Sequence, residues 1–212
     1  MIVLGLGRFG SSVASEAMRL GFEVLGVDGD ARRVQELADD LTHAVQADTT
    51  DIEALRQLGA NEFATAVVGI GTDVEASILT TANLDDFGVA DIWAKAVTRP
   101  HGRILERVGA HHVVYPEYDM GRRLAHLVGG HILEWVQLDD DFAMVETLAP
   151  RALHGLSLAD AAVRARFGVT VVCVKAAGGG FTHATPDTVL DDGDVVVVAG
   201  PTEPAERFAT LS

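Results

Sequence analysis

The feature that most constrains the fold of this chain is a glycine-rich stretch at residues 5–10, Gly-Leu-Gly-Arg-Phe-Gly. It follows an apolar run at residues 2–4 and precedes a segment with helical character. In a strand–turn–helix unit of this kind, Gly5 permits the tight turn, Gly7 lets a phosphate approach the backbone, and Gly10 lets the helix pack closely on the sheet. The stretch therefore predicts a Rossmann-type nucleotide-binding domain.

The residues around these glycines support a nucleotide site. Asp28 ends the next expected strand, residues 23–27, where a carboxylate accepts hydrogen bonds from ribose hydroxyls. Arg8 lies inside the glycine stretch, where its charge can reach a phosphate, and Phe9 beside it is a further candidate ligand-binding residue. The glycine pattern alone is weak evidence, but here a strand, a helix and an acid stand where the motif requires them.

Apolar runs and helical segments alternate from the N-terminus to about residue 115. Asp51 and Asp73 are the expected N-caps of two of the helices. Strands that alternate with helices indicate a parallel sheet covered on both faces, and six strands match a complete doubly wound α/β domain. The expected strands are residues 2–4, 23–27, 44–47, 65–68, 91–96 and 112–115.

Further candidate residues follow the carboxyl ends of these strands, where open α/β sheets bind ligands. Lys95 stands at an otherwise buried strand end and requires a phosphate or carboxylate partner, because an unpaired charge is costly to bury. The other candidate ligand-binding residues at strand ends are Asp30, Asp48, Thr49, Gly69, Ile70 and Gly71.

The sequence pattern changes after Pro116. Residues 120–138 are expected to form a pair of crossover helices interrupted at Gly129-Gly130. A smaller α+β domain should follow, with strands at 142–145, 169–174 and 194–199 and a helix at 157–167. We therefore expect a Rossmann-like domain at residues 1–117, crossover helices at 118–138 and a second domain at 139–212.

Charge and hydropathy exclude several classes of partner. The 212 residues carry a formal net charge of −15, which argues against nucleic acid and disfavours adhesion to anionic lipid. Apolar stretches such as residues 195–199 are far shorter than the ~20 residues of a membrane span, and no signal peptide is evident. The expectation is a soluble, cytoplasmic protein without direct membrane insertion, whose single cysteine, Cys173, packs in the core.

The sequence shows no catalytic constellation and no metal-ligand spacing among its eight histidines. Glu117 and Asp119 are candidates for contact with a divalent cation, Mg²⁺ or Ca²⁺, although a hydrogen bond at an interface explains them equally well. An NAD-dependent oxidoreductase remains an alternative, because Asp28 also suits the ribose of NAD(H). Against it, the second domain offers no evident acid–base pair for hydride transfer.

Five motifs taken together resemble a known family. Their order and spacing are similar to those of the cytosolic regulatory subunits of Trk/Ktr potassium-uptake systems, of the TrkA or KtrA type. The resemblance covers essentially the whole chain, as an RCK N-domain and a smaller RCK C-domain. The motifs are residues 5–10, Asp28, Ile-Trp-Ala-Lys-Ala at 92–96, Pro-Glu-Tyr-Asp-Met-Gly at 116–121 and Val-Arg-Ala-Arg-Phe-Gly at 163–168.

This resemblance implies regulation rather than catalysis. Subunits of the family form homodimers that assemble into an octameric ring beneath a membrane potassium transporter. ATP or ADP bound in the N-domain shifts the ring between activating and inactivating shapes. The family would thus place the chain in the cytoplasm, at the inner face of the membrane through its transporter partner.

The resemblance also implies roles for individual residues. The three glycines cradle the phosphates and Asp28 holds the ribose, while Arg8 and Lys95 face phosphates. Glu117 matches an acid that helps to hold a cation near the nucleotide. Positions near the adenosine are matched by Asp30, Asp48 and Thr49.

A second ligand, cyclic di-AMP, is implied for the C-domain, because several relatives bind it in an apolar cleft with an arginine. The identity of the membrane partner also stays open, because the same motifs fit an RCK-type sensor of another cation channel or antiporter. The positions that match the cyclic di-AMP cleft are Leu158, Val163, Arg164, Val171 and Pro186.

Overall fold

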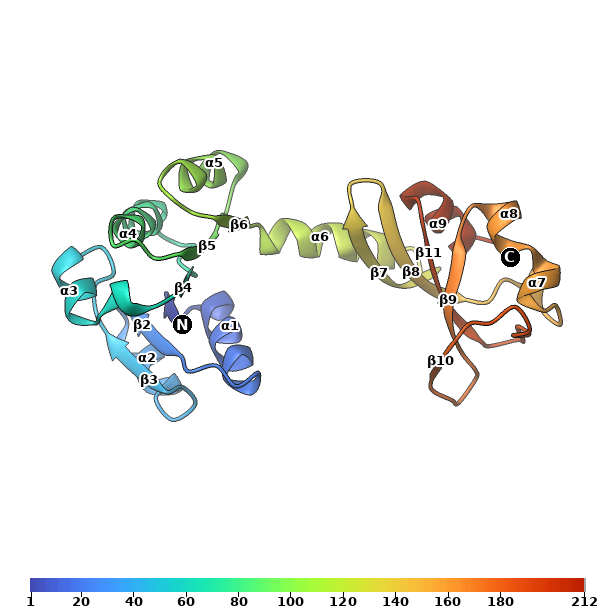
Figure 1. The fold of residues 1–212 in the computed structure, drawn as a ribbon, viewed down its shortest axis with the longest axis horizontal. Coiled ribbons are helices and arrows are strands. Elements are labelled where there is room, and N and C mark those ends of the chain that lie inside the picture. The colour runs from blue at the N-terminus through green and yellow to red at the C-terminus, as the bar shows by residue number, and fades with distance from the viewer. Residues whose placement is uncertain (212) are drawn as a thin grey trace. The chain divides into compact units, whose positions relative to one another are not determined.

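The computed structural model describes residues 1–211, which form two compact units. The first unit is Met1–Glu117 and the second begins at Tyr118 (Figure 1). Each unit has its own sheet and its own hydrophobic core. No helix within residues 1–211 is long and apolar enough to cross a membrane.

The first unit is built on a six-stranded parallel sheet, as the alternating pattern predicted. The strand order β3-β2-β1-β4-β5-β6 reverses direction at β1, which is the arrangement of a doubly wound Rossmann sheet. The strands are β1 (Ile2–Leu4), β2 (Leu25–Asp28), β3 (His43–Gln46), β4 (Thr65–Val68), β5 (Asp91–Lys95) and β6 (His112–Val114).

Helices cover both faces of this sheet. Asp51 and Asp73 cap α3 and α4 through their side chains, as expected from the sequence, and Asp30 caps α2 in the same way. The helices are α1 (Arg8–Arg19), α2 (Ala31–Leu37), α3 (Ile52–Gln57), α4 (Val74–Asp86) and α5 (Arg99–Arg107), with the short 3-10 helix η1 (Ala60–Glu62).

The core of this unit is divided by the sheet into two layers. Val3 points into the layer formed with α1 and α2, whereas its neighbours Ile2 and Leu4 point into the layer formed with α3, α4 and α5. All three side chains are fully buried. Because successive strand residues face opposite sides, a strand buried on both faces reads as a continuous apolar run.

His101 in α5 is a buried histidine of this unit. It is 3% exposed, and burial lowers its pKa below the ordinary value of 6.5. The unfolded chain therefore takes up a proton first as the pH falls below 6.5, so the stability that depends on neutral His101 is complete above that pH and is lost below it. We expect the free energy of unfolding to fall between pH 7.5 and 5.5, by up to about 1.4 kcal/mol per pH unit for this one proton.

His101→Gln should flatten that pH dependence, because glutamine does not titrate. Denaturant unfolding at a series of pH values measures the effect. His43→Gln is the matched control, since His43 is exposed on β3. An equal slope in wild type and His101→Gln contradicts the assignment.

The second unit contains a five-stranded antiparallel sheet of order β10-β9-β11-β8-β7. Neither β10 nor α9 was expected from the sequence, and Cys173 on β9 is half-buried rather than in the core. The strands are β7 (Ile132–Asp139), β8 (Phe142–Leu148), β9 (Thr170–Lys175), β10 (Phe181–His183) and β11 (Val195–Gly200). Helix α6 (Pro116–Leu127) begins at the last two residues of the first unit and continues in the second. The helices that lie wholly in the second unit are η2 (Arg151–Leu153), α7 (Leu158–Ala161), α8 (Val163–Phe167) and α9 (Thr202–Ala209).

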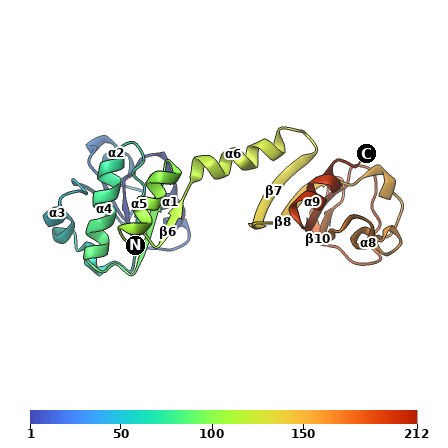
Figure 2. The same cartoon turned by 90° about the horizontal axis from the view of Figure 1, so that it is seen from above.

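The prediction of two crossover helices is wrong for the second helix. One helix, α6, is followed by strand β7, which forms a hairpin with β8 (Figure 2). The pairing of β7 shifts register between Ile132 and Glu134. This irregularity spaces the buried residues Ile132 and Trp135 three apart instead of two, which imitates the spacing of a helix.

The expected helix at residues 157–167 is also divided. Ser157 caps α7 as an N-terminal serine should, but Ala162 adopts a left-handed conformation, with φ 46°, between α7 and α8. No glycine or proline marks this break in the sequence. Side chains from both short helices still pack on the core of the second unit, among them Leu158 and Val163.

Candidate functional site

A cleft of 830 Å³ lies in the first unit at the carboxyl ends of the parallel strands. Phe9, Gly10 and Asp30 are sequence candidates that do not line it. The candidates that do line it are Gly5, Gly7, Arg8, Asp28, Asp48, Thr49, Gly69, Ile70, Gly71, Lys95 and Glu117.

The glycine loop is tightly packed at two positions and open at the third. Gly5 has φ 90°, a left-handed conformation that favours glycine, and it lies against Ile70. A Cβ on Gly10 would stand 1.9 Å from the carbonyl oxygen of Gly5. A Cβ on Gly7, by contrast, would have no heavy atom of residues 1–211 within 4 Å. Gly5 and Gly10 thus serve the fold, and Gly7 leaves space at the cleft.

The N-terminus of α1 meets the cleft at this open glycine. Gly7 is the N-cap of α1, and both Gly7 and Arg8 line the cleft. The first turn, residues 8–11, contains no acidic side chain. The unpaired N–H groups of a helix N-terminus and its dipole favour a negatively charged group. The geometry here is therefore that of a phosphate-binding site.

Asp28 is buried and already accepts hydrogen bonds from the chain. Its Oδ2 accepts from the backbone N–H of Leu6 at 2.7 Å, and its Oδ1 accepts from that of Asp30 at 2.8 Å. Arg33 donates from Nη1 to Oδ2 at 3.3 Å. Asp28 therefore ties the glycine loop to the turn before α2, in addition to standing where a ribose would lie.

The other polar candidates already form hydrogen bonds within the fold. Asp48 accepts hydrogen bonds from the N–H and hydroxyl of Thr50, which lower its pKa. The hydroxyl of Thr49 is buried and accepts one from Thr80 at 2.8 Å. Asp30 caps α2 and pairs with Arg32.

Lys95 has the carboxylate partner that its position required. Its Nζ donates to Oε1 of Glu117 at 2.7 Å, and it lies 5.7 Å from the ring centre of Phe9. The Lys95 side chain is 12% exposed and that of Glu117 is 67% exposed. The hydrogen bond from Lys95 lowers the pKa of Glu117, and the charge of Arg8 adds a smaller effect in the same direction. The Lys95–Glu117 pair thus forms part of the cleft lining, close enough to Arg8 for its charge to act on Glu117.

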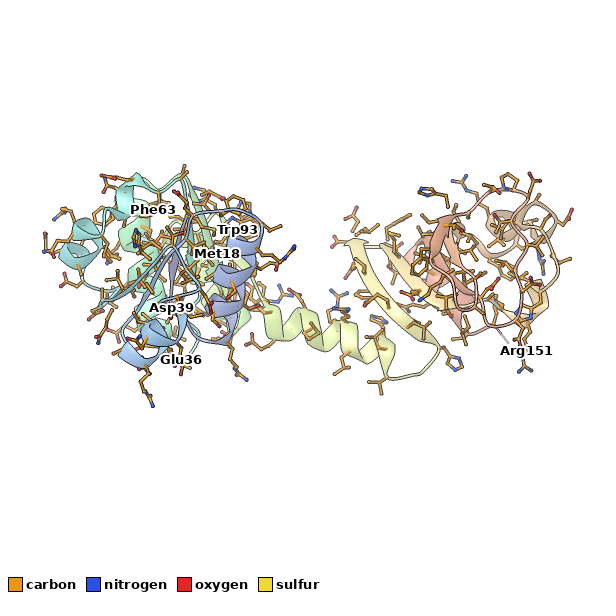
Figure 3. All side chains as sticks on the ribbon, turned by 90° about the horizontal axis from the view of Figure 1, so that it is seen from below. Met18, Glu36, Asp39, Phe63, Trp93 and Arg151 are labelled. Carbon is orange, nitrogen blue, oxygen red and sulfur yellow. The ribbon has the colours of Figure 1, made fainter. Side chains whose placement is uncertain are left out.

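Glu117→Gln should lower the stability of the first unit. The substitution leaves the nearly buried ammonium of Lys95 without its charged partner, but solvent screens the exposed carboxylate, so the expected loss is up to about 1 kcal/mol. Denaturant unfolding without ligand measures it. Glu36→Gln on the exposed surface of α2 is the control (Figure 3). A gain in stability on Glu117→Gln contradicts a stabilising pair.

Glu117 was also the candidate metal ligand. Among residues 1–211, no three His, Cys, Asp or Glu side chains gather closely enough to hold a metal ion. A cation at Glu117 therefore needs ligands from another molecule, such as nucleotide phosphates.

Several residues of the cleft were missed by the sequence analysis. Arg33 stands one helical turn after the cap of α2, close enough to Asp28 to have been considered from spacing alone. Gln46 and Thr50 follow the end of β3, where a ligand was already expected. The remaining cleft residues that were not predicted are Gly29, Ala47, Thr72, Asp73, Ala76 and Val97.

A second, smaller cleft of 290 Å³ lies in the second unit. All five residues that were predicted to bind a ligand in the C-domain line this cleft, although they are separated in the sequence. Its lining residues are Leu158, Ala159, Val163, Arg164, Val169, Thr170, Val171, Ala184, Thr185 and Pro186.

Comparison with known proteins identifies the family. The family model described as the TrkA-N domain matches residues 1–116, and the TrkA-C domain matches residues 143–211. The chain is 37% identical over 207 residues to Ktr system potassium uptake protein A of Bacillus subtilis, with 97% of this chain and 93% of that protein covered. The chain belongs to the TrkA/Ktr family. A second relative, Ktr system potassium uptake protein A of Vibrio alginolyticus, is 36% identical over 200 residues, with 94% and 91% covered.

Solved structures share the fold of this TrkA/Ktr-family chain. The GsuK RCK domain matches with a TM-score of 0.68 at 16% identity, over 100% of this chain and 47% of that one. The GsuK channel bound to NAD matches with 0.67 at 16% identity, over 100% and 39%. GsuK bound to ADP matches with 0.51 at 16% identity, over 57% and 32%. The chain thus spans less than half the length of these solved chains.

Each of the two cleft linings falls within one of the two matched family domains, with a single exception. The TrkA-N match contains every residue that lines the first cleft except Glu117, and the TrkA-C match contains every residue that lines the second.

Proposed function

We propose that this TrkA/Ktr-family chain is a regulatory subunit of a membrane potassium transporter and that ATP and ADP bind in its N-terminal cleft. The observation that carries the proposal is the N-terminus of α1, where Gly7 is open and the exposed Arg8 supplies positive charge near the Lys95–Glu117 pair. The cleft volume of 830 Å³ lies within the range of pockets that bury a small ligand.

The potassium-transport role rests on the relatives, two of which are named as potassium uptake proteins and align over nearly their whole length. Solved GsuK structures contain NAD or ADP, which supports a nucleotide as the ligand class. An NAD-dependent oxidoreductase is the weaker candidate, because the relatives act in potassium uptake. A different cation channel or antiporter as the partner stays compatible with the fold.

The proposed switch depends on the difference between ATP and ADP. A ligand shifts a conformational equilibrium only by its differential affinity for the two states. ATP carries one more charged phosphate than ADP, and Arg8 is exposed at the phosphate end of the cleft, where it can reach that phosphate or one bound to a neighbouring subunit. Glu117 together with the phosphates would hold a Mg²⁺ or Ca²⁺ ion, since such ions take carboxylate and phosphate oxygens.

The test is potassium flux through the reconstituted transporter with ATP or with ADP. Arg8→Ala should abolish the difference between the two nucleotides, whereas Arg19→Ala, at the far end of α1, should preserve it. If ATP and ADP still change transport differently in Arg8→Ala, the role of Arg8 is wrong. If neither nucleotide changes transport in the wild type, the proposed function is wrong.

We extend the proposal to assembly as a homodimer and an octameric ring on the cytoplasmic side of the membrane. Apolar side chains of α6 and β7 are exposed, and Met120 and Leu124 on α6 and Val128 just after it are spaced four residues apart, on one face of the helix. Exposed apolar patches of this kind mark interaction surfaces. The exposed residues are Tyr118, Met120, Leu124 and Val128, with Leu133, Val136 and Leu138 on β7.

Cyclic di-AMP is proposed as a ligand of the second cleft. All five predicted residues line this cleft, which supports the proposal. The cleft volume of 290 Å³ suits one half of a site that two chains share. Arg164→Ala should remove thermal stabilisation by cyclic di-AMP, and Arg151→Ala, which does not alter the cleft lining, should not (Figure 3). No stabilisation of the wild type contradicts this proposal.

A further inference from the structure

The adenosine end of the first cleft contains an arginine next to the ribose-binding acid. Arg33 lines the cleft, and its side chain is 46% exposed. It donates from Nη1 to Oδ2 of the buried Asp28, and its Nε lies 4.0 Å from Asp30. Asp30 is in turn paired with Arg32 at 3.1 Å. Two carboxylates and two guanidinium groups thus meet beside the expected position of the ribose.

The hydrogen bonds of Asp28 leave little room for a second ribose hydroxyl. Each carboxylate oxygen has two lone pairs. Oδ2 already accepts from Leu6 and Arg33, and Oδ1 accepts from the N–H of Asp30. One acceptor position therefore remains on Oδ1. Arg33, in contrast, has five N–H donors and spends one of them on Asp28.

In Rossmann sites an acid beside the ribose binds its 2′-hydroxyl, and a nearby arginine accommodates a 2′-phosphate. This cleft contains both groups in contact. We propose that Arg33 sets the specificity at the ribose 2′ position, so that the cleft accepts adenosine ligands with a 2′-phosphate as well as those without one. This inference rests on the proposed nucleotide site and concerns which nucleotides it admits.

The physical reason is charge. A 2′-phosphate brought next to Asp28 alone meets a buried negative charge, whereas the planar guanidinium of Arg33 pairs with Asp28 and still offers donors to phosphate oxygens. Arg32 already neutralises Asp30, so Arg33 is not needed for that acid. Gln46 lies on the same wall of the cleft, but its amide donates to the carbonyl oxygen of Gly29.

The test uses two ligands that differ only at the 2′ position, AMP and adenosine 2′,5′-bisphosphate. Calorimetric titration of the whole protein gives both dissociation constants. We expect them to agree within about tenfold in the wild type. Arg33→Ala should weaken the bisphosphate at least tenfold more than AMP, since each lost charge-assisted hydrogen bond is worth about 1.5 kcal/mol or more.

Arg32→Ala is the matched control, because Arg32 is adjacent, more exposed and outside the cleft lining. It should leave the ratio of the two constants unchanged. Arg33→Lys keeps the charge without the planar fork and should give an intermediate ratio, which guards against a folding defect in Arg33→Ala. Equal weakening of both ligands in Arg33→Ala, or rejection of the bisphosphate by the wild type while AMP binds, overturns the inference. Failure of the wild type to bind AMP, ATP and ADP overturns the proposed nucleotide site itself.

Discussion

Gly7→Asp is expected to abolish nucleotide binding while leaving the fold as stable as before, or slightly more stable. Gly7 is the N-cap of α1 with φ −66° and ψ −175°, which aspartate adopts readily, and a Cβ there meets open space within the described chain. Aspartate is among the preferred N-cap residues and its charge is favourable at a helix N-terminus. The same carboxylate occupies the anion site and repels a phosphate.

The two effects of Gly7→Asp have opposite signs and are measured together by thermal unfolding. A nucleotide at 100 times its dissociation constant stabilises a protein by about 2.7 kcal/mol. A loss of two charge-assisted hydrogen bonds weakens binding about 100-fold or more, which reduces that stabilisation to about 0.4 kcal/mol or less. Gly121→Ala in α6 is the control, since its Cβ also meets open space among residues 1–211. Undiminished stabilisation of Gly7→Asp by ATP contradicts the site.

Gly10→Ala is expected to destabilise the first unit by about 3 kcal/mol or more. Its new Cβ would lie 1.9 Å from the carbonyl oxygen of Gly5, a backbone atom of the same tight loop. Gly5 is itself confined by Gly69, whose own Cβ position is 2.8 Å from that oxygen. Overpacking against backbone cannot be relieved by a change of rotamer, so the loop or α1 must shift.

Denaturant unfolding of Gly10→Ala and Gly7→Ala tests this contrast between two glycines of one motif. Gly7→Ala should lie within about 1 kcal/mol of the wild type, because only an N-cap preference is lost. Equal stability of the two variants would show that the close packing of α1 on the glycine loop is not as described.

The first unit could be predicted from the sequence because its signals are local. The capping residues Asp51 and Asp73 act within three residues of their position in the chain, and the glycine motif and Asp28 are recognised from the strands and the helix next to them. The sequence also predicted a phosphate or carboxylate partner for Lys95, because a buried ammonium group requires an anion. That the anion would be Glu117, 22 residues later in the first turn of α6, depends on the tertiary fold.

The sequence predictions were wrong where the spacing of apolar residues fits both a helix and a strand, or where tertiary packing overrode the local sequence pattern. The irregular pairing of β7 places the buried residues Ile132 and Trp135 three positions apart, as in a helix. A helix was therefore expected where the chain forms a strand. The left-handed Ala162 breaks a helix without a sequence signal. Arg33 was overlooked because an arginine in a helix is usually a solvated residue, although its spacing from Asp28 and from the cap of α2 is compatible with the contact that the structure shows.

The central claim is that the cleft at the N-terminus of α1 is an adenine-nucleotide site. The most direct measurement is calorimetric titration of the purified wild type and Gly7→Asp with ATP, ADP and NADH in turn. We expect ATP and ADP to bind the wild type, to compete for one site per chain and to fail to bind Gly7→Asp. Tight binding of NADH without any binding of ATP or ADP, or equal binding of ATP by both proteins, would contradict it.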